Sequence, residues 1–405
     1  RARARCAGRR DGAERMVRRV MIAVAAALVV LGARGAAAAA LQEPVVADCS
    51  GGDGEAGAVT LTVKKGTVTV AGAVEYDARV YEYEGEIMVP GPTIVMQAGT
   101  RCEVTIVNEL EDVAANSECP MHENDFHCPD VTNLHTHGLH VSPDEDNIDT
   151  HVSPGESLTY TYNLPVDHLP GTHWYHAHHH GSTALQVSGG MLGMLQVVAA
   201  EAPDGEALPL AMPADLAALY ADDDNVHDLV LMHMNFAGQG DGTPPFGAML
   251  DMPGISAAYG GGTQSVPLNA ELADADVDDF YVVNGQLSPS VDIAPNSVSL
   301  LRLVNGGGTR SLFLELDDDG ACELRLIARD GVFQYLDDND AYPAVSRIVM
   351  VPGTRADVAL LCGSAAAGTT IDVNAAHVTD TMLGSENVFG PQTAVLRLPP
   401  PPPAA

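Results

Sequence analysis

Hydrophobic and polar residues alternate along much of the chain from residue 59 onward. The segment "VTLTVKKGTVTVAG" carries this alternation on both sides of residues 65–66, where we expect a turn between two strands. Alternation or short apolar runs follow at "CEVTIVNEL", "SLTYTYNL", "SVSLLRLVN" and "DVALLC". No segment sustains the 3.6-residue period of a helix. The pattern therefore predicts an all-β protein made of sandwiches.

Composition along the chain divides it into two strand-rich regions. We expect one domain at residues 59–200 and a second at residues 227–398, joined by a linker rich in Pro, Ala and Asp at residues 201–226. Residues 41–58 are rich in Gly and Ala and are predicted to be loose. The acidic insert at residues 111–130 is predicted to be a loop. Residues 399–405, "PPPPPAA", form a Pro-rich tail that we expect to be extended.

The first 40 residues have the character of an upstream segment followed by a secretory signal. After Met16, two arginines precede an apolar run at residues 20–31, and small residues continue to Ala40. We expect cleavage near residues 38–41 and a secreted or extracytoplasmic protein. A retained amino-terminal membrane anchor is the alternative, although the apolar run is short for a membrane span. Since residue 1 is Arg, we also expect the sequence either to be incomplete at this end or to open upstream of the true start.

The charge of the chain is strongly negative. The net charge is −34, and from residue 41 onward 11 Lys and Arg stand against 52 Asp and Glu, a balance of −41. Such a surface repels nucleic acid and anionic membranes. The acidic runs lack the oxygen-ligand spacing of a calcium-binding EF-hand and are predicted to be solvated loops. We therefore expect no nucleic-acid partner and no membrane contact beyond the leader.

Six cysteines follow the leader, and an even number in a secreted chain indicates disulfides. Six cysteines allow 15 pairings, between which the sequence alone does not choose. We predict Cys119–Cys128, which lie in one Pro-rich loop, and Cys322–Cys362 within the second region.

Two histidine motifs carry the candidate chemistry. The first, "LHTHGLH", contains His135 and His137, and the second, "GTHWYHAHHHG", contains His176 and His178. Residues i and i+2 of a strand face the same side, so each pair can point at one place. Four converging imidazoles suit a copper, zinc or iron ion. The alternative for either pair alone is an ordinary surface or core position. Two such pairs, each followed by Gly, favour a metal site.

These motifs resemble the two amino-terminal copper motifs of the multicopper oxidases, the family of laccases and ascorbate oxidase. "VPGPTIVMQAGTRCEVTIVNEL" is similar to the family's first domain, and "YVVNGQLSPSVDIAPNSVSLLRLVNGG" to its second. The resemblance implies two tandem cupredoxin-like Greek-key β-sandwiches with copper as the cofactor. It also implies that His135 is a type 2 copper ligand and that His137, His176 and His178 are type 3 ligands.

The remaining histidines are weaker candidates. We expect His173 to pack in the core, His179 and His180 to lie in a tight turn, and His140 to be an ordinary strand residue. His122 and His127 lie in the cysteine loop, where we expect adventitious metal binding at most. Asp146 and Asp149 are expected to be solvated loop carboxylates, with a proton or substrate route as the alternative.

The sequence departs from the family after residue 180. A complete member has two further motifs, which supply the other trinuclear ligands and a His-Cys-His connection to a type 1 copper. Here only His227, His233 and His377 follow, and no His-Cys-His occurs. Cys362, His377 and Met382 have the order of a type 1 site, but the gap from Cys to His is too long. We expect a third domain of roughly 130–150 residues to be missing; a natural two-domain protein is the alternative.

The functional hypothesis is a copper-dependent oxidoreductase. It would take single electrons from a small reducing substrate and reduce dioxygen to water. A non-catalytic extracellular copper-binding protein is the alternative. A nitrite-reductase-like protein is disfavoured, because no suitable Cys follows His137 in the first region. The sequence specifies neither the electron donor nor the oligomeric state.

Overall fold

The fold was obtained as a computed structural model, and its described part runs from residue 39 to residue 398 with gaps. The described residues are 39–52, 55–70, 74–111, 127–200, 214–222, 224–235, 279–291, 293, 296–308, 311–317, 320–334, 342–363, 371–377 and 393–398. The predicted leader, the linker at 201–213 and the Pro-rich tail lie outside this part, as do Cys119, His122 and Met382.

The amino-terminal strands form two five-stranded sheets. One sheet has the order β1 (Val46–Asp48), β5 (Thr93–Gln97), β10 (Leu192–Val198), β9 (Gly171–His176) and β7 (His135–His137). The other has the order β4 (Glu86–Met88), β3 (Val74–Tyr83), β2 (Gly57–Val70), β6 (Arg101–Asn108) and β8 (Ser157–Asn163). Side chains from both sheets share one buried core, which includes Leu61, Ile106, Tyr162, Ile94 and Leu195. This is the first sandwich.

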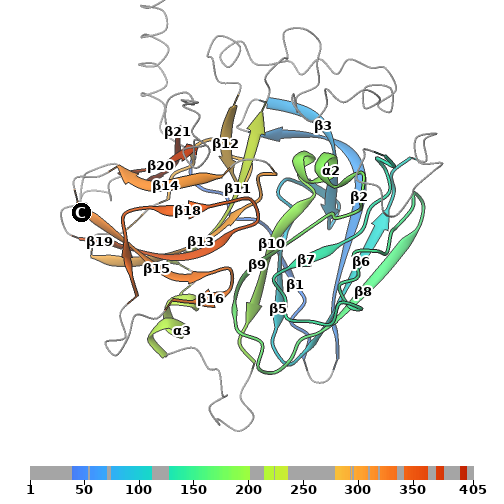
Figure 1. The fold of residues 1–405 in the computed structure, drawn as a ribbon, viewed down its shortest axis with the longest axis horizontal. Coiled ribbons are helices and arrows are strands. Elements are labelled where there is room, and N and C mark those ends of the chain that lie inside the picture. The colour runs from blue at the N-terminus through green and yellow to red at the C-terminus, as the bar shows by residue number, and fades with distance from the viewer. Residues whose placement is uncertain are drawn as a thin grey trace, which may run out of the picture.

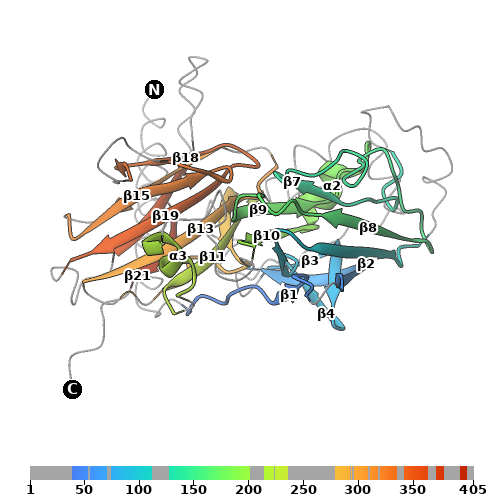
Figure 2. The ribbon, with the colours of Figure 1, turned by 90° about the horizontal axis from the view of Figure 1, so that it is seen from below.

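The carboxyl-terminal strands form a second sandwich beside the first (Figures 1 and 2). Its larger sheet has the order β12 (Asp279–Val283), β11 (Val226–Asn235), β13 (Ser297–Asn305), β19 (Arg355–Cys362), β15 (Cys322–Arg329) and β16 (Val332–Phe333), and β17 (Ala344–Val345) pairs with β15. Its smaller sheet has the order β18 (Ile348–Met350), β14 (Leu312–Asp317), β20 (Ile371–His377) and β21 (Thr393–Leu398). The all-β, cupredoxin-like architecture expected from the sequence is confirmed. Parallel pairs such as β2 with β6 and β11 with β13 accompany the antiparallel ones.

A third apolar cluster joins the two sandwiches. Trp174 of β9 and Met194 of β10 pack with Val230 and Met232 of β11 and with Val304 of β13. Figure 2 shows β9 and β10 between the two bodies of strands. Burial of each such side chain stabilises the fold by roughly 1.5–3 kcal/mol. Strand β9 is therefore held from both sides, which fixes the histidines at its end.

The turn expected at residues 65–66 does not form. Strand β2 runs without interruption from Gly57 to Val70, and Gly66 pairs with Ala78 of β3. The reason is a change of face along this long strand. Its earlier apolar residues belong to the core of the first sandwich, whereas Val68 and Val70 belong to the cluster that joins the sandwiches. A Cβ at Gly66 would lie 2.4 Å from Ile87 Cδ1, so this Gly makes room for a neighbouring side chain.

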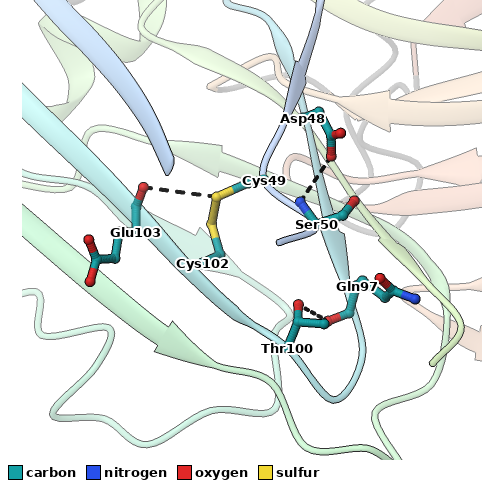
Figure 3. The surroundings of a disulfide bond; sticks show 7 residues. All are labelled: Asp48, Cys49, Ser50, Gln97, Thr100, Cys102 and Glu103. Carbon is teal, nitrogen blue, oxygen red and sulfur yellow. Dashed lines mark hydrogen bonds between the residues drawn. A yellow bond between two sulfur atoms is a disulfide. The ribbon is translucent and has the colours of Figure 1, made fainter. Parts of the chain in front are cut away.

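Two segments expected to be irregular contain regular structure. Residues 46–48 form β1, which pairs in parallel with β5, and the following Cys49 forms a disulfide with Cys102 of β6 (Figure 3). Within the predicted linker, helix α3 (Ala214–Tyr220) places Leu216 in a small core against β13. Long-range contacts outweighed local composition in both segments. The helix α2 (Thr183–Gly189) follows the second histidine motif and packs on β3.

The predicted Cys322–Cys362 disulfide is confirmed, with the two residues directly opposite in β15 and β19. Cys128 is also disulfide-bonded, and its predicted partner Cys119 lies outside the described residues. Since Cys362 is in a disulfide, its thiol is not free for a type 1 copper, in agreement with its rejection on sequence grounds. Among the described residues, no helix is long and apolar enough to cross a membrane.

Candidate metal centre

The two histidine motifs meet because their strands are neighbours. Strands β7 and β9 pair in antiparallel register, with His135 opposite His176 and His137 opposite Trp174. Residues directly opposite in such a pair have Cβ atoms about 4.5–5.5 Å apart. Strand pairing, rather than closeness in sequence, therefore brings the first pair of histidines to the second.

Three of the four predicted ligands form one compact group. One ring nitrogen from each of His135, His137 and His176 lies within 4.8 Å of the other two. The ring of His178 lies 5.0 Å from that of His135 and 5.5 Å from that of His176, between centroids. All four predicted residues are thus brought together, and His178 extends the group on the side of His135.

Aromatic and backbone groups hold this arrangement in place. The ring of Trp174 stacks on His176 at 4.2 Å and lies 5.4 Å from His137. The Nδ1–H of His176 donates to the carbonyl oxygen of Ala177 at 2.9 Å, which leaves Nε2 free to bind a metal. The backbone N–H of His178 donates to Asn133 Oδ1 at 2.7 Å. These ring and backbone contacts therefore orient the histidines and leave His176 Nε2 free to bind a metal.

Comparison with known proteins identifies the region that contains this group. The sequence model of the family described as "Multicopper oxidase" matches residues 62–202, which include all four histidines. This region of the chain is therefore similar to the multicopper oxidases.

Curated relatives match parts of the chain, and solved structures of multicopper oxidases share its fold over about 90% of its length. The iron transport multicopper oxidase FET3 of Kluyveromyces lactis is 25% identical over 252 residues, which are 60% of this chain and 30% of that protein. Laccase-4 of Thanatephorus cucumeris is 30% identical over 114 residues, 27% of this chain and 18% of that protein. The chain therefore spans less than a third of the length of these relatives.

The McoA multicopper oxidase of Aquifex aeolicus has a TM-score of 0.61 at 18% identity, covering 90% of this chain and 65% of McoA. A multicopper oxidase from Campylobacter jejuni has a TM-score of 0.58 at 19% identity, covering 90% and 62%.

The histidine group in this region suits copper, the metal of the multicopper oxidases that the region resembles. Burial lowers the pKa of His137 to about 4, with help from the charge of Arg355, and burial lowers the pKa of His176 to about 3. Burial also lowers the pKa of His178. These imidazoles are therefore neutral at neutral pH, the form that binds a metal ion. The Nδ1 atom of His178 is buried without a hydrogen-bond partner among the described residues, as expected for an atom that needs a ligand.

Asp146 lies next to the group, contrary to the expectation of a purely solvated loop carboxylate. Its Oδ2 is 2.7 Å from His135 Nδ1, although the two are not aligned for a hydrogen bond, and its Oδ1 accepts from the backbone N–H of Thr136 at 2.8 Å. Carboxylates are common outer partners of metal-binding histidines. Asp149 has no such contact with the group among the described interactions: its backbone N–H donates to Asn147 Oδ1.

The second sandwich contributes residues that no sequence motif connects with the site. A Cβ at Gly353 would lie 3.4 Å from His137 Cε1, so this Gly packs closely over the ring. Arg355, in an ion pair with Asp330 at 3.2 Å, reaches the turn after β7, where its Nη2 would lie 2.5 Å from a Cβ at Gly138. Gly138 has a φ of 108° and its position tolerates no side chain. The sandwiches thus enclose one side of the group together.

Six other histidines fall into two further clusters. His173 is buried, as expected, and its ring lies 5.6 Å from that of His168, which in turn lies 5.2 Å from that of His140. His179 lies between His127 and His151, at 6.2 Å and 6.1 Å. Sequence analysis missed His151 and His168, because each is alone in its segment and only the fold brings it to other histidines.

Gly193 is expected to be essential for the strand that ends in His176. It lies opposite Tyr175 in the β9–β10 pair, and a Cβ there would be 2.4 Å from Tyr175 Oη. Tyr175 is fully buried and its hydroxyl donates to the Pro92 carbonyl, so its ring has no room to move away. Gly193→Ala should therefore lower the free energy of unfolding by about 1–3 kcal/mol through overpacking.

Urea unfolding followed by fluorescence of Trp174, the single Trp of the chain, measures this effect on the first sandwich. Gly363→Ala is the control, because a Cβ at Gly363 meets nothing closer than 3.7 Å. An equal effect of the two substitutions would contradict the proposed role of Gly193.

Proposed function

We propose that the chain is part of a secreted copper-dependent oxidase that passes single electrons from a small donor to dioxygen. Copper would bind His135, His137, His176 and His178, the first as a type 2 ligand and the others as type 3 ligands. Copper supplies one-electron redox chemistry and an affinity for dioxygen that protein side chains lack. The observation that carries the proposal is the convergence of the three ring-nitrogen positions within 4.8 Å, with His178 beside them.

The chain's own residues would position and tune this site. The His176–Ala177 hydrogen bond selects the ring nitrogen that faces the metal, and Asp146 lies beside His135. Trp174 and Gly353 exclude water from one side of the group by close packing. The positive charge of Arg355 near His137 disfavours protonation of that ring and so keeps it available as a ligand.

We propose that the four histidines make up the part of a trinuclear copper site that a multicopper oxidase takes from its first domain. By the resemblance, the other ligands and the type 1 copper come from motifs absent from these 405 residues. We also propose that the two sandwiches are separate domains at residues 59–200 and 227–398. The two disulfides at Cys49–Cys102 and Cys322–Cys362 support an extracytoplasmic location, where such bonds persist. A purely copper-binding role is not favoured by relatives that are named oxidases and laccases.

Copper loading followed by a single turnover tests the proposal. The chain is stripped of metal with a chelator, loaded with copper and passed through a desalting column, and the retained copper is measured. We expect copper to be retained at less than the full set of a complete family member. After chemical reduction, we expect admission of air to restore the Cu(II) signal in electron paramagnetic resonance or absorption. A chain that retains no copper, or one that stays reduced in air, would contradict the proposal.

A further inference from the structure

A second histidine cluster lies beside the proposed copper group and is not part of it. His127, His151 and His179 come from three segments that are separated by 24 and 28 residues in the sequence. None of them belongs to the group of His135, His137 and His176. His179 is the residue after the proposed ligand His178, and its ring is flanked by His127 and His151 instead.

Local contacts hold each of the three segments where the rings meet. The backbone N–H of His127 donates to the Gly181 carbonyl at 3.2 Å. A Cβ at Gly181 would lie 2.4 Å from His127 Nδ1, so the absence of a side chain lets the ring lie on this turn. Next to His151, Val152 exchanges two backbone hydrogen bonds with Thr132. The cluster is thus built from loops that are tied to one another, and not from a mobile surface strand.

His179 has the features of a metal ligand. It is 2% exposed, and its Nε2 is buried without a hydrogen-bond partner among the described residues. The Ser182 hydroxyl donates to the Val131 carbonyl at 2.9 Å and so can accept from His179 Nδ1–H, at 3.4 Å. This places the proton on Nδ1 and leaves a lone pair on Nε2. A buried nitrogen in this state needs a partner, and the nearest rings are imidazoles.

The ring separations are within reach of one shared ion. Two imidazoles bound to one zinc ion through nitrogens at about 2.0–2.1 Å have ring centroids roughly 5–6 Å apart. The separations of 6.1 Å and 6.2 Å are slightly longer than this range, and the rings cross His179 at 75° and 74°. His151 is exposed and His127 is half-buried, so a small rotamer adjustment of either ring brings it closer. Their exposure also gives an ion access from solvent.

We propose that His127, His151 and His179 form a second metal site that binds a divalent transition metal ion, Zn(II) or Cu(II), through three imidazoles. Imidazole is a preferred donor for both ions. The site lies within one residue of the proposed copper group along the chain, yet it uses a different set of rings. It is independent of the oxidase proposal, because it requires neither redox chemistry nor the His135 group.

Zinc titration of the full chain in a His137→Ala/His176→Ala background tests this proposal. The background disables the proposed copper group, and competition with a chromophoric chelator measures the zinc that remains bound. We expect a site whose affinity falls at least about tenfold when either His151→Ala or His127→Ala is added. The matched control is His140→Ala, which removes another exposed histidine that contacts His168 instead.

Two further outcomes are decisive. Trp174 fluorescence must be the same in all variants, so that a loss of zinc reflects the ligands and not the fold. The three-histidine site would be overturned if adding His151→Ala or His127→Ala left the zinc affinity of the background unchanged. Loss of zinc in the His140→Ala control to the same extent would overturn it as well. Failure of the oxidase proposal would leave these results unchanged, because the background already lacks that group.

Discussion

His176→Ala is expected to abolish stable copper binding at the group formed by β7 and β9. The His176 ring lies 5.2 Å from His135 and 6.0 Å from His137, and it is the most buried of the three. The hydrogen bond from His176 Nδ1 to the Ala177 carbonyl also leaves Nε2 as the nitrogen that can bind the metal. Loss of a partner that merely orients a ligand typically costs about 10- to 100-fold in metal affinity. Loss of the ligand itself should cost more than this.

Copper per chain after loading and desalting measures the effect. His178→Ala should lower the copper content too, because its ring lies beside His135 and His176. His140→Ala is the control, since His140 is the last residue of the first motif and contacts His168 rather than the group. The alanine variants should keep the fold, because strand pairing in β7 and β9 uses backbone atoms. Unchanged copper content in both His176→Ala and His178→Ala would refute the ligand assignment.

Removal of the Cys49–Cys102 disulfide is expected to destabilise the first sandwich by about 4 kcal/mol. The bond closes a loop with a sequence separation of 53, and the loop-closure entropy of a chain of this length gives that magnitude at 25 °C. Figure 3 shows the bond joining the segment after β1 to strand β6. Without it, β1 is attached to the sheet through its pairing with β5 alone among the described strands. We therefore expect Cys49→Ala/Cys102→Ala to weaken the whole sandwich and to free this segment first.

Urea unfolding followed by Trp174 fluorescence reports on this sandwich, because the ring lies in β9. The single variant Cys49→Ala is the control for packing: it already lacks the crosslink, so it should be nearly as destabilised as the double variant. A double variant within about 1 kcal/mol of the wild type would show that the loop is constrained by other contacts in the unfolded state.

Much of the site was predictable because its signals are local. A strand places residues i and i+2 on one face, so each His-x-His pair had a direction before any fold was known. The sandwich strands followed from the alternation of apolar and polar residues. Local signals failed where a contact came from elsewhere. Residues 65–66 continue β2, because β3 pairs with them and each half of the strand faces its own core.

The all-β architecture, the two histidine pairs and the resemblance to the multicopper oxidases are readable from the amino-acid sequence alone. These follow from periodicities of two residues and from short motifs, which act over a few positions. Only the tertiary structure decided that His135 lies opposite His176, that Gly353 and Arg355 of the second sandwich reach the first, and that His127, His151 and His179 meet. These contacts depend on the register and packing of segments far apart in the chain, so residue spacing does not predict them.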